Sequence, residues 1–172
     1  MSSYKTLLIP IIHEILIKEI GEANITPLKW TRVSPIKYKF LIDIGDFTEV
    51  VTVGFEQITN DIEKQFYFPP KYRNLQKIYN VGYEISGTET QFAKTDLKTL
   101  LTILSTVVDI IKNFIENNDI DGLYVKGSEK EIGSGNTSQK TNLYKAFISK
   151  QLQQISQFGF DTYRDGFILI KK

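Results

Sequence analysis

Residues 95–116, TDLKTLLTILSTVVDIIKNFIE, are the stretch that decides the fold of this chain. Large apolar residues recur in it at steps of three and four, which places them on one side of an α-helix. They are Leu97, Leu100, Leu101, Leu104, Val107, Val108, Ile111, Phe114 and Ile115. Ile103 and Ile110 widen this stripe, so we expect the helix to lie across a sheet. Thr95 or Asp96 can cap it, because a short side-chain oxygen accepts from the free N–H groups of the first turn.

Before this helix the apolar period changes to two, which is typical of half-buried β-strands. Ile36–Ile44 and Phe47–Phe55 alternate in this way on either side of Gly45-Asp46, a tight-turn sequence, and predict a hairpin. The other strands expected in this part of the chain are Lys29–Val33, Gln65–Phe68 and Tyr79–Ile85. The sequence therefore predicts an antiparallel meander of four or five strands.

The two ends of the chain complete the predicted order. An amphipathic helix is expected from about Ile9 to Ile20, ending at Gly21. After the central helix we expect a strand at Gly122–Lys126, a polar flexible loop at Gly127–Ser138 and a helix from Ser138 or Gln139. A closing hairpin is expected from Phe158–Tyr163 and Phe167–Ile170. The prediction is one α+β domain, residues 1–172, in the order helix, meander, helix, strand, helix, hairpin.

Composition excludes several kinds of site. The chain of 172 residues has a formal net charge of +1, no cysteine and one histidine, His13. Zinc sites of the usual His/Cys type and disulfides are therefore excluded, and any histidine-dependent relay has to use His13. We expect His13 to be an ordinary surface residue, and we expect no catalytic, metal or cofactor residues. The N-terminal apolar stretch is interrupted by Glu14 and Lys18, so neither a leader peptide nor a membrane span is expected.

Asn136–Tyr144 ends in Leu143-Tyr144, and Gly159-Phe160 follows the last predicted helix. Together with the order of elements, these residues resemble the acyl-CoA N-acetyltransferase (GNAT) superfamily. The resemblance implies a GNAT-like topology, in which the central helix binds the cofactor and Tyr144 is the candidate general acid.

The chain departs from the GNAT pattern at two places. Thr137 stands where the superfamily has the asparagine of its Asn-x-x-Ala-x-x-Leu-Tyr pattern, and Asn136 is one residue out of register. Gly87–Asp96 reads GTETQFAKTD, with one glycine, where an acetyltransferase has a glycine-rich turn that approaches the pyrophosphate. We therefore expect the topology without the cofactor site.

Two further stretches carry a second resemblance. Residues 104–112, LSTVVDIIK, and 142–147, NLYKAF, lie within Gly87–Lys150, and this region is similar to an uncharacterised family of small tailed-bacteriophage proteins. The resemblance implies a phage accessory or virion component, located in the virion or in the cytoplasm of the infected bacterial cell.

Three clusters of polar residues are weaker candidates. GSGNTS, Gly133–Ser138, precedes a helix and can present N–H groups to an anion. We expect instead a flexible loop that ends in an ordinary helix cap, and this loop can become ordered on a partner. A possible nucleic-acid face consists of Lys29, Arg32, Lys37 and Lys39 with Trp30 and Tyr38. A possible hard-metal set consists of Asp43, Asp46, Glu49 and Glu56. Lysines on the solvent side of a strand commonly serve solubility, so we expect the basic residues to form an ordinary exposed face. Strand alternation keeps the four carboxylates apart, so we do not expect them to bind a metal.

The sequence favours a non-enzymatic protein that acts through protein–protein contacts. An acyl-CoA-dependent N-acyltransferase with a degenerate cofactor site and a nucleic-acid-associated accessory protein are the alternatives. The near-zero net charge does not support nucleic-acid binding, and the sequence identifies no membrane association, small-molecule substrate or cofactor.

Overall fold

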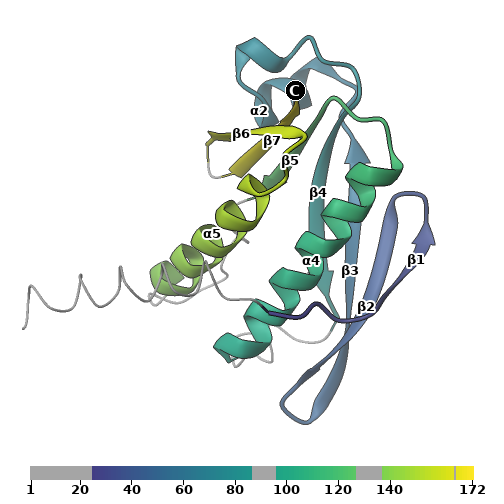
Figure 1. The fold of residues 1–172 in the computed structure, drawn as a ribbon, viewed down its shortest axis with the longest axis vertical. Helices are drawn as coiled ribbons and strands as arrows, with labels where there is room; N and C mark the ends of the chain where they lie inside the picture. The colour runs from purple at the N-terminus through teal and green to yellow at the C-terminus, as the bar shows by residue number, and fades with distance from the viewer. Residues whose placement is uncertain (1–24, 87–95, 127–136, 165) are drawn as a thin grey trace, which may run out of the picture.

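The period-two segments of the chain pair into one mostly antiparallel sheet of seven strands, and the fold is α+β (Figure 1). A computed structural model describes residues 25–86, 96–126, 137–164 and 166–172. The strands are β1 (Trp30–Ser34), β2 (Lys37–Ile44), β3 (Phe47–Gln57), β4 (Ile78–Ile85), β5 (Gly122–Lys126), β6 (Phe158–Tyr163) and β7 (Gly166–Lys171). The helices of the described residues are α2 (Asp61–Tyr67), α4 (Leu97–Asn117) and α5 (Thr137–Gln153), with a short 3-10 helix η1 (Pro70–Tyr72). Strand order in the sheet is β1-β2-β3-β4-β5-β7-β6.

Helix α4 is the centre of the core, as its spacing predicts. Asp96 caps it by accepting a hydrogen bond from the backbone N–H of Thr99 at 2.7 Å. Its buried apolar side chains are Leu100, Leu101, Ile103, Leu104, Val107, Val108, Ile110, Ile111, Phe114 and Ile115. Phe114 stacks on Phe55 of β3, with ring centroids 3.7 Å apart. The predicted helix and its cap are confirmed.

The segment before β1 is fastened to α4 by polar groups. Ser105 Oγ donates to the carbonyl of Ile25 at 2.6 Å, and the N–H of Leu28 donates to Thr106 Oγ1 at 3.0 Å. Thr106 is fully buried, and its hydroxyl also donates to the carbonyl of Thr102. These bonds satisfy backbone groups of an irregular segment that lies against the core.

The sheet has two faces that differ in their cover. The inner face lies against α4 and α5, which are on the same side of the sheet (Figure 1). The other, which we call the outer face, is covered near β4, β5 and β7 by the segment of α2 and η1. That smaller cluster contains Ile58, Phe68, Ile78, Tyr124 and Ile168. Over β2, β3 and the second half of β4, no described element covers the outer face, and Lys37, Lys39 and Leu41 are exposed there.

The strand predicted at Gln65–Phe68 is wrong, because this segment ends helix α2. Asn60 caps the helix, and its side-chain oxygen accepts from the N–H of Glu63 at 2.8 Å. The N–H of Phe68 donates to the carbonyl of Lys64, after which Pro69 and Pro70 end the helix. The aromatic run that suggests a strand therefore forms the last turn of a short helix.

The two halves of the sheet meet at one parallel pairing. β4 pairs with β5 from Ile78↔Gly122 to Val81↔Val125, and then β4 continues to Ile85 beside β3. The other elements predicted within the described residues are confirmed: the meander has four strands, β5 follows α4, and β6 and β7 form the closing hairpin. Helix α5 begins at Thr137, one residue before the earliest predicted start at Ser138. The helix expected at residues 9–20 and most of the loop Gly127–Ser138 lie outside the described residues.

Candidate functional site

The lysines of β2 lie on the opposite face of the sheet from the aromatic rings beside them, and Arg32 of β1 lies 5.9 Å from the ring centre of the buried Tyr38. Lys37 and Lys39 lie on the outer face, whereas Tyr38 points inward and is fully buried. Trp30 is half-buried, packs edge-on against Tyr38 with centroids 5.3 Å apart, and donates its indole N–H to Asp109 at 2.7 Å. Burial raises the pKa of Tyr38, an effect that Arg32 partly opposes. The two rings do not offer a stacking surface beside the lysines, so the structure does not bring together the predicted nucleic-acid face.

The predicted carboxylate set does not converge either. Asp43 accepts from the hydroxyl of Thr48 at 2.7 Å on the exposed side of the hairpin. Glu49 is buried and accepts from Ser86 Oγ at 2.7 Å, and Ser86 Oγ also accepts from the N–H of Val50. Glu49 therefore ties the end of β4 to β3. Among the described residues, no group of three or more histidines and carboxylates can hold a metal ion.

Several predicted candidates lie outside the described part of the chain. They are His13, residues 87–95 of the segment that departs from the GNAT turn, residues 133–136 of the GSGNTS loop, and the side chain of Tyr144. The backbone at Tyr144 belongs to α5.

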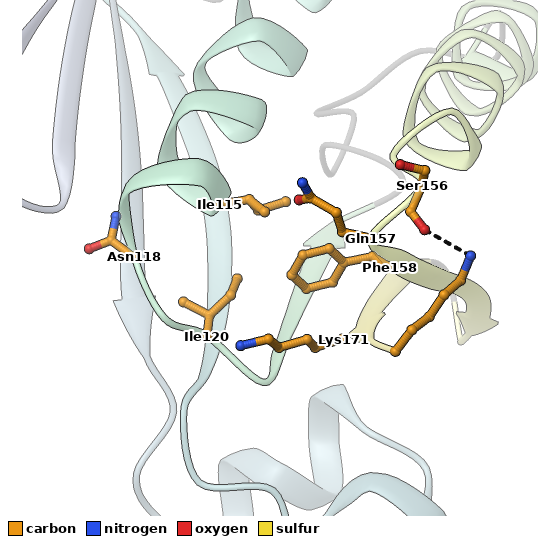
Figure 2. Close-up of a pocket in the computed structure, with 8 residues that line it drawn as sticks. Ile115, Asn118, Ile120, Ser156, Gln157, Phe158 and Lys171 are labelled. Carbon is orange, nitrogen blue, oxygen red and sulfur yellow. Dashed lines mark hydrogen bonds between the residues drawn. The ribbon is translucent and has the colours of Figure 1, made fainter.

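A pocket of about 360 Å³ lies where α4 ends beside the start of β6 and the end of β7 (Figure 2). Ile115, Ile120 and Phe158 give it an apolar side, and Figure 2 shows the side chains of Ile115 and Phe158 pointing into the same space. The ammonium groups at its edge are already engaged. Lys172 donates to the carbonyl of Ser156 at 2.9 Å, and Lys171 pairs with Asp119 at 2.7 Å.

The charges beside this pocket brace the fold. Hydrogen bonds from Lys171 and Lys77 lower the pKa of Asp119 to about 2. Asp121 accepts from the backbone N–H groups of Gln76 and Lys77 at 3.1 and 2.8 Å. These contacts join the start of β4 to the segment before β5. Among the described residues that line the pocket, Lys172 contacts the backbone carbonyl of Ser156 and Lys171 contacts Asp119, so both ammonium groups serve structural contacts.

Helix α2 presents an apolar surface outward and hides its lysine. Ile62 is 82% exposed and Phe66 is 52% exposed, whereas Lys64 is only 8% exposed. The ammonium of Lys64 reaches through to the carbonyl of Leu75 at 3.1 Å. The helix also packs Tyr67 inward against Tyr124, with ring centroids 5.0 Å apart. It differs from an ordinary surface helix in exposing two large apolar side chains and burying a lysine. The orientation of α2 is therefore a candidate functional feature.

The hairpin of β6 and β7 extends this surface. Arg164, at the turn, has a positive φ of 55° and places its guanidinium 4.7 Å from the ring centre of Phe66 and 5.4 Å from that of Tyr163. Hydrogen bonding to Arg164 lowers the pKa of Tyr163. We call Ile62, Phe66, Tyr163 and Arg164 the α2 patch. The α2 patch was not predicted, because the aromatic run Gln65–Phe68 fits a strand, although Asn60-Asp61-Ile62-Glu63 carries a helix-start signal.

Comparisons with protein-family models, with curated proteins and with solved structures found no match to this chain. None of the described helices is long and apolar enough to cross a membrane. The function is therefore inferred from the surfaces that the described residues present.

Proposed function

We propose that this chain is a non-enzymatic protein that acts through protein–protein contacts, and that the α2 patch is a contact surface. The observation that carries the proposal is that α2 exposes Ile62 and Phe66 while Lys64 is buried. Such an arrangement gains nothing for the isolated chain, because an exposed large apolar side chain forgoes roughly 1.5–3 kcal/mol of burial free energy. A partner that covers the patch recovers this free energy.

The chemistry of the α2 patch suits a protein partner. Aromatic and arginine side chains are enriched where binding energy concentrates, and the patch combines Phe66, Tyr163 and Arg164. The guanidinium of Arg164 lies over the ring of Phe66, so a partner can contact an apolar centre with a cation beside it. Asp61 and Glu63 add negative charge on the same helix.

Our proposal places this activity in a bacteriophage particle or in the infected bacterial cell. Its support is the likeness of residues 104–112 and 142–147 to small tailed-phage proteins. Residues 104–112 belong to α4, and Phe147 is buried in α5, so the likeness runs through the helices that form the core. Similar core residues favour a similar fold. The proposed role as a phage protein rests on the resemblance in sequence.

A specific observation favours the second candidate, an acyl-CoA-dependent N-acyltransferase with a degenerate cofactor site. A four-strand meander leads to α4, and the strand after α4, β5, pairs in parallel with β4. Strand order and this parallel pairing support a GNAT-like topology, but fold alone does not imply activity. Titration with acetyl-CoA separates the candidates: we expect no thermal shift, whereas ligand at a hundred times its dissociation constant would add about 2.7 kcal/mol. A clear upward shift favours the acyltransferase.

Site-specific photocrosslinking in the cells that produce the protein tests the proposed contact. A benzophenone amino acid at position 66 should give a discrete adduct of higher mass, because Phe66 lies in the α2 patch. The same probe at Lys98, exposed in the first turn of α4, is the control and should give none. Ile62→Ser should remove the adduct at position 66 without changing the melting temperature. Absence of an adduct at position 66, or equal adducts at both positions, contradicts the proposed surface.

A further inference from the structure

Two glycines lie directly opposite each other in the middle of the outer face. Gly54 of β3 pairs with Gly82 of β4, and Lys37 of β2 is the next residue in the same row. A Cβ atom built on either glycine would have no neighbour within 4 Å, and neither residue has a left-handed backbone. Nothing among the described residues therefore requires glycine at these positions.

Glycine in the interior of a strand is unfavourable without such a reason, because it loses the most backbone entropy and has no side chain to pack. A glycine pair with open space in front is expected where another surface approaches the backbone closely. The outer face around the pair is thus a candidate docking surface.

The charges beside the glycine pair lie on different strands, with the positive charge on β2 and the negative charge on β4. In the next row Lys39 of β2, Thr52 of β3 and Glu84 of β4 lie side by side. Strands are about 4.8 Å apart, so roughly 10 Å separates the Lys39 and Glu84 backbones. Both side chains are exposed, and in the described residues neither ammonium nor carboxylate has an ion-pair partner.

This arrangement is complementary to itself. Two copies can meet through their outer faces, related by a two-fold axis parallel to β3. This axis places β2 of each copy opposite β4 of the other. Lys39 of one copy then faces Glu84 of the other, and the reverse contact forms at the same time. In the glycine row, Lys37 of each copy faces Gly82 of the other, where the missing side chain leaves room for the lysine stem. We propose that the outer face is an isologous contact between two copies of this chain.

The area of the face sets the expected strength. β2, β3 and β4 lie side by side only along Val51–Gly54 of β3, a surface about 15 Å wide and 13 Å long, or roughly 200 Å² per copy before side-chain relief. Standard protein–protein interfaces bury about 800 Å² per partner. The dimer should therefore dissociate in dilute solution, and its association should weaken as salt screens the two ion pairs.

This inference is independent of the α2 patch, and variants distinguish the two surfaces. Sedimentation equilibrium of the full chain over a range of concentrations should show reversible dimerisation. Gly82→Thr should weaken the association by about tenfold or more, since the added side chains hold the sheets apart, while the melting temperature stays the same or rises. Ile62→Ser should leave the association unchanged.

Charge reversal gives the sharpest test. Lys39→Glu alone and Glu84→Lys alone should each weaken the association by about tenfold or more, because each places like charges across both contacts. An equimolar mixture of the two variants should associate as a heterodimer with at least wild-type strength, since opposite charges then meet at both contacts. Lys98→Glu is the matched control and should have no effect. A wild-type chain that stays monomeric to millimolar concentration, a dimer that survives Gly82→Thr, or a mixture that fails to recover overturns the proposal.

Discussion

Replacing Phe114 with alanine should remove a large part of the stability of this fold. Phe114 is 1% exposed, stacks on Phe55 at an interplanar angle of 8° and meets the edge of Tyr79 at 5.4 Å. Truncating a buried phenylalanine costs about 3–5 kcal/mol, against a total of about 5–15 kcal/mol for a typical domain. Far-UV circular dichroism during urea unfolding measures the loss. With a slope of about 2 kcal/mol per molar urea, a loss of 4 kcal/mol lowers the midpoint by about 2 M.

A double-mutant cycle separates the ring contact from simple burial. Phe114→Ala and Phe55→Ala should each be destabilising, and the coupling between them should be about 0.5–1.5 kcal/mol, the value of an aromatic pair beyond its buried area. Ile62→Ala, at an exposed position, is the control and should change stability by less than about 0.5 kcal/mol. If Phe114→Ala costs less than about 1 kcal/mol at an unchanged slope, the packing of α4 on β3 described above is refuted.

Three further predictions concern other parts of the fold. Gly166→Ala should lower the free energy of unfolding by about 1–3 kcal/mol, because its Cβ would collide with the buried ring of Tyr124; urea unfolding checks this, and an unchanged midpoint would contradict the close approach. Trp30→Phe should lower the free energy of unfolding by about 1–2 kcal/mol, because it removes the hydrogen bond to Asp109. An unchanged free energy of unfolding would show that this bond does not stabilise the position of β1. The lowered pKa of Asp119 gives stability that is present above about pH 4 and is lost as the pH falls through about 2. The melting temperature of Asp119→Asn should therefore fall less than that of the wild type over this pH range. An equal fall in both proteins would show that other groups cause the acid sensitivity.

Elements with a strong period were predictable from the sequence. The spacing of Leu100 to Ile115 identifies α4 because tertiary packing follows the same stripe. The hairpin of β2 and β3 was predictable because Gly45 supplies the positive φ of 62° that its turn needs. Phe47 shows the limit of the pattern: it continues the inward alternation of β3 and yet is 56% exposed.

Contacts between distant segments were not predictable. Lys64 is buried because Leu75 offers it a carbonyl, and Glu49 is buried because Ser86 donates to it. The positions of Leu75 and Ser86 relative to these side chains depend on the tertiary path of the chain, which no local sequence pattern reveals. The pairing of Gly54 with Gly82 has the same origin, since the register of β3 with β4 depends on the whole connection between them. The α2 patch was missed for a different reason, because a short aromatic run fits a strand and a helix end equally well.

The single parallel joint of the sheet has a consequence for how the chain is made. β1 to β4 pair through neighbours in sequence, whereas β4 and β5 are held by four residue pairs and meet only after the chain has passed through residues 86–121. Local pairings of this kind form fast, and a pairing that closes a long connection forms later. During synthesis on a ribosome the meander emerges first, with the backbone of β4 exposed along one edge. Until α4 and β5 arrive, that edge can pair with another nascent chain, so the interval in which they are translated is when the protein is most open to misassembly.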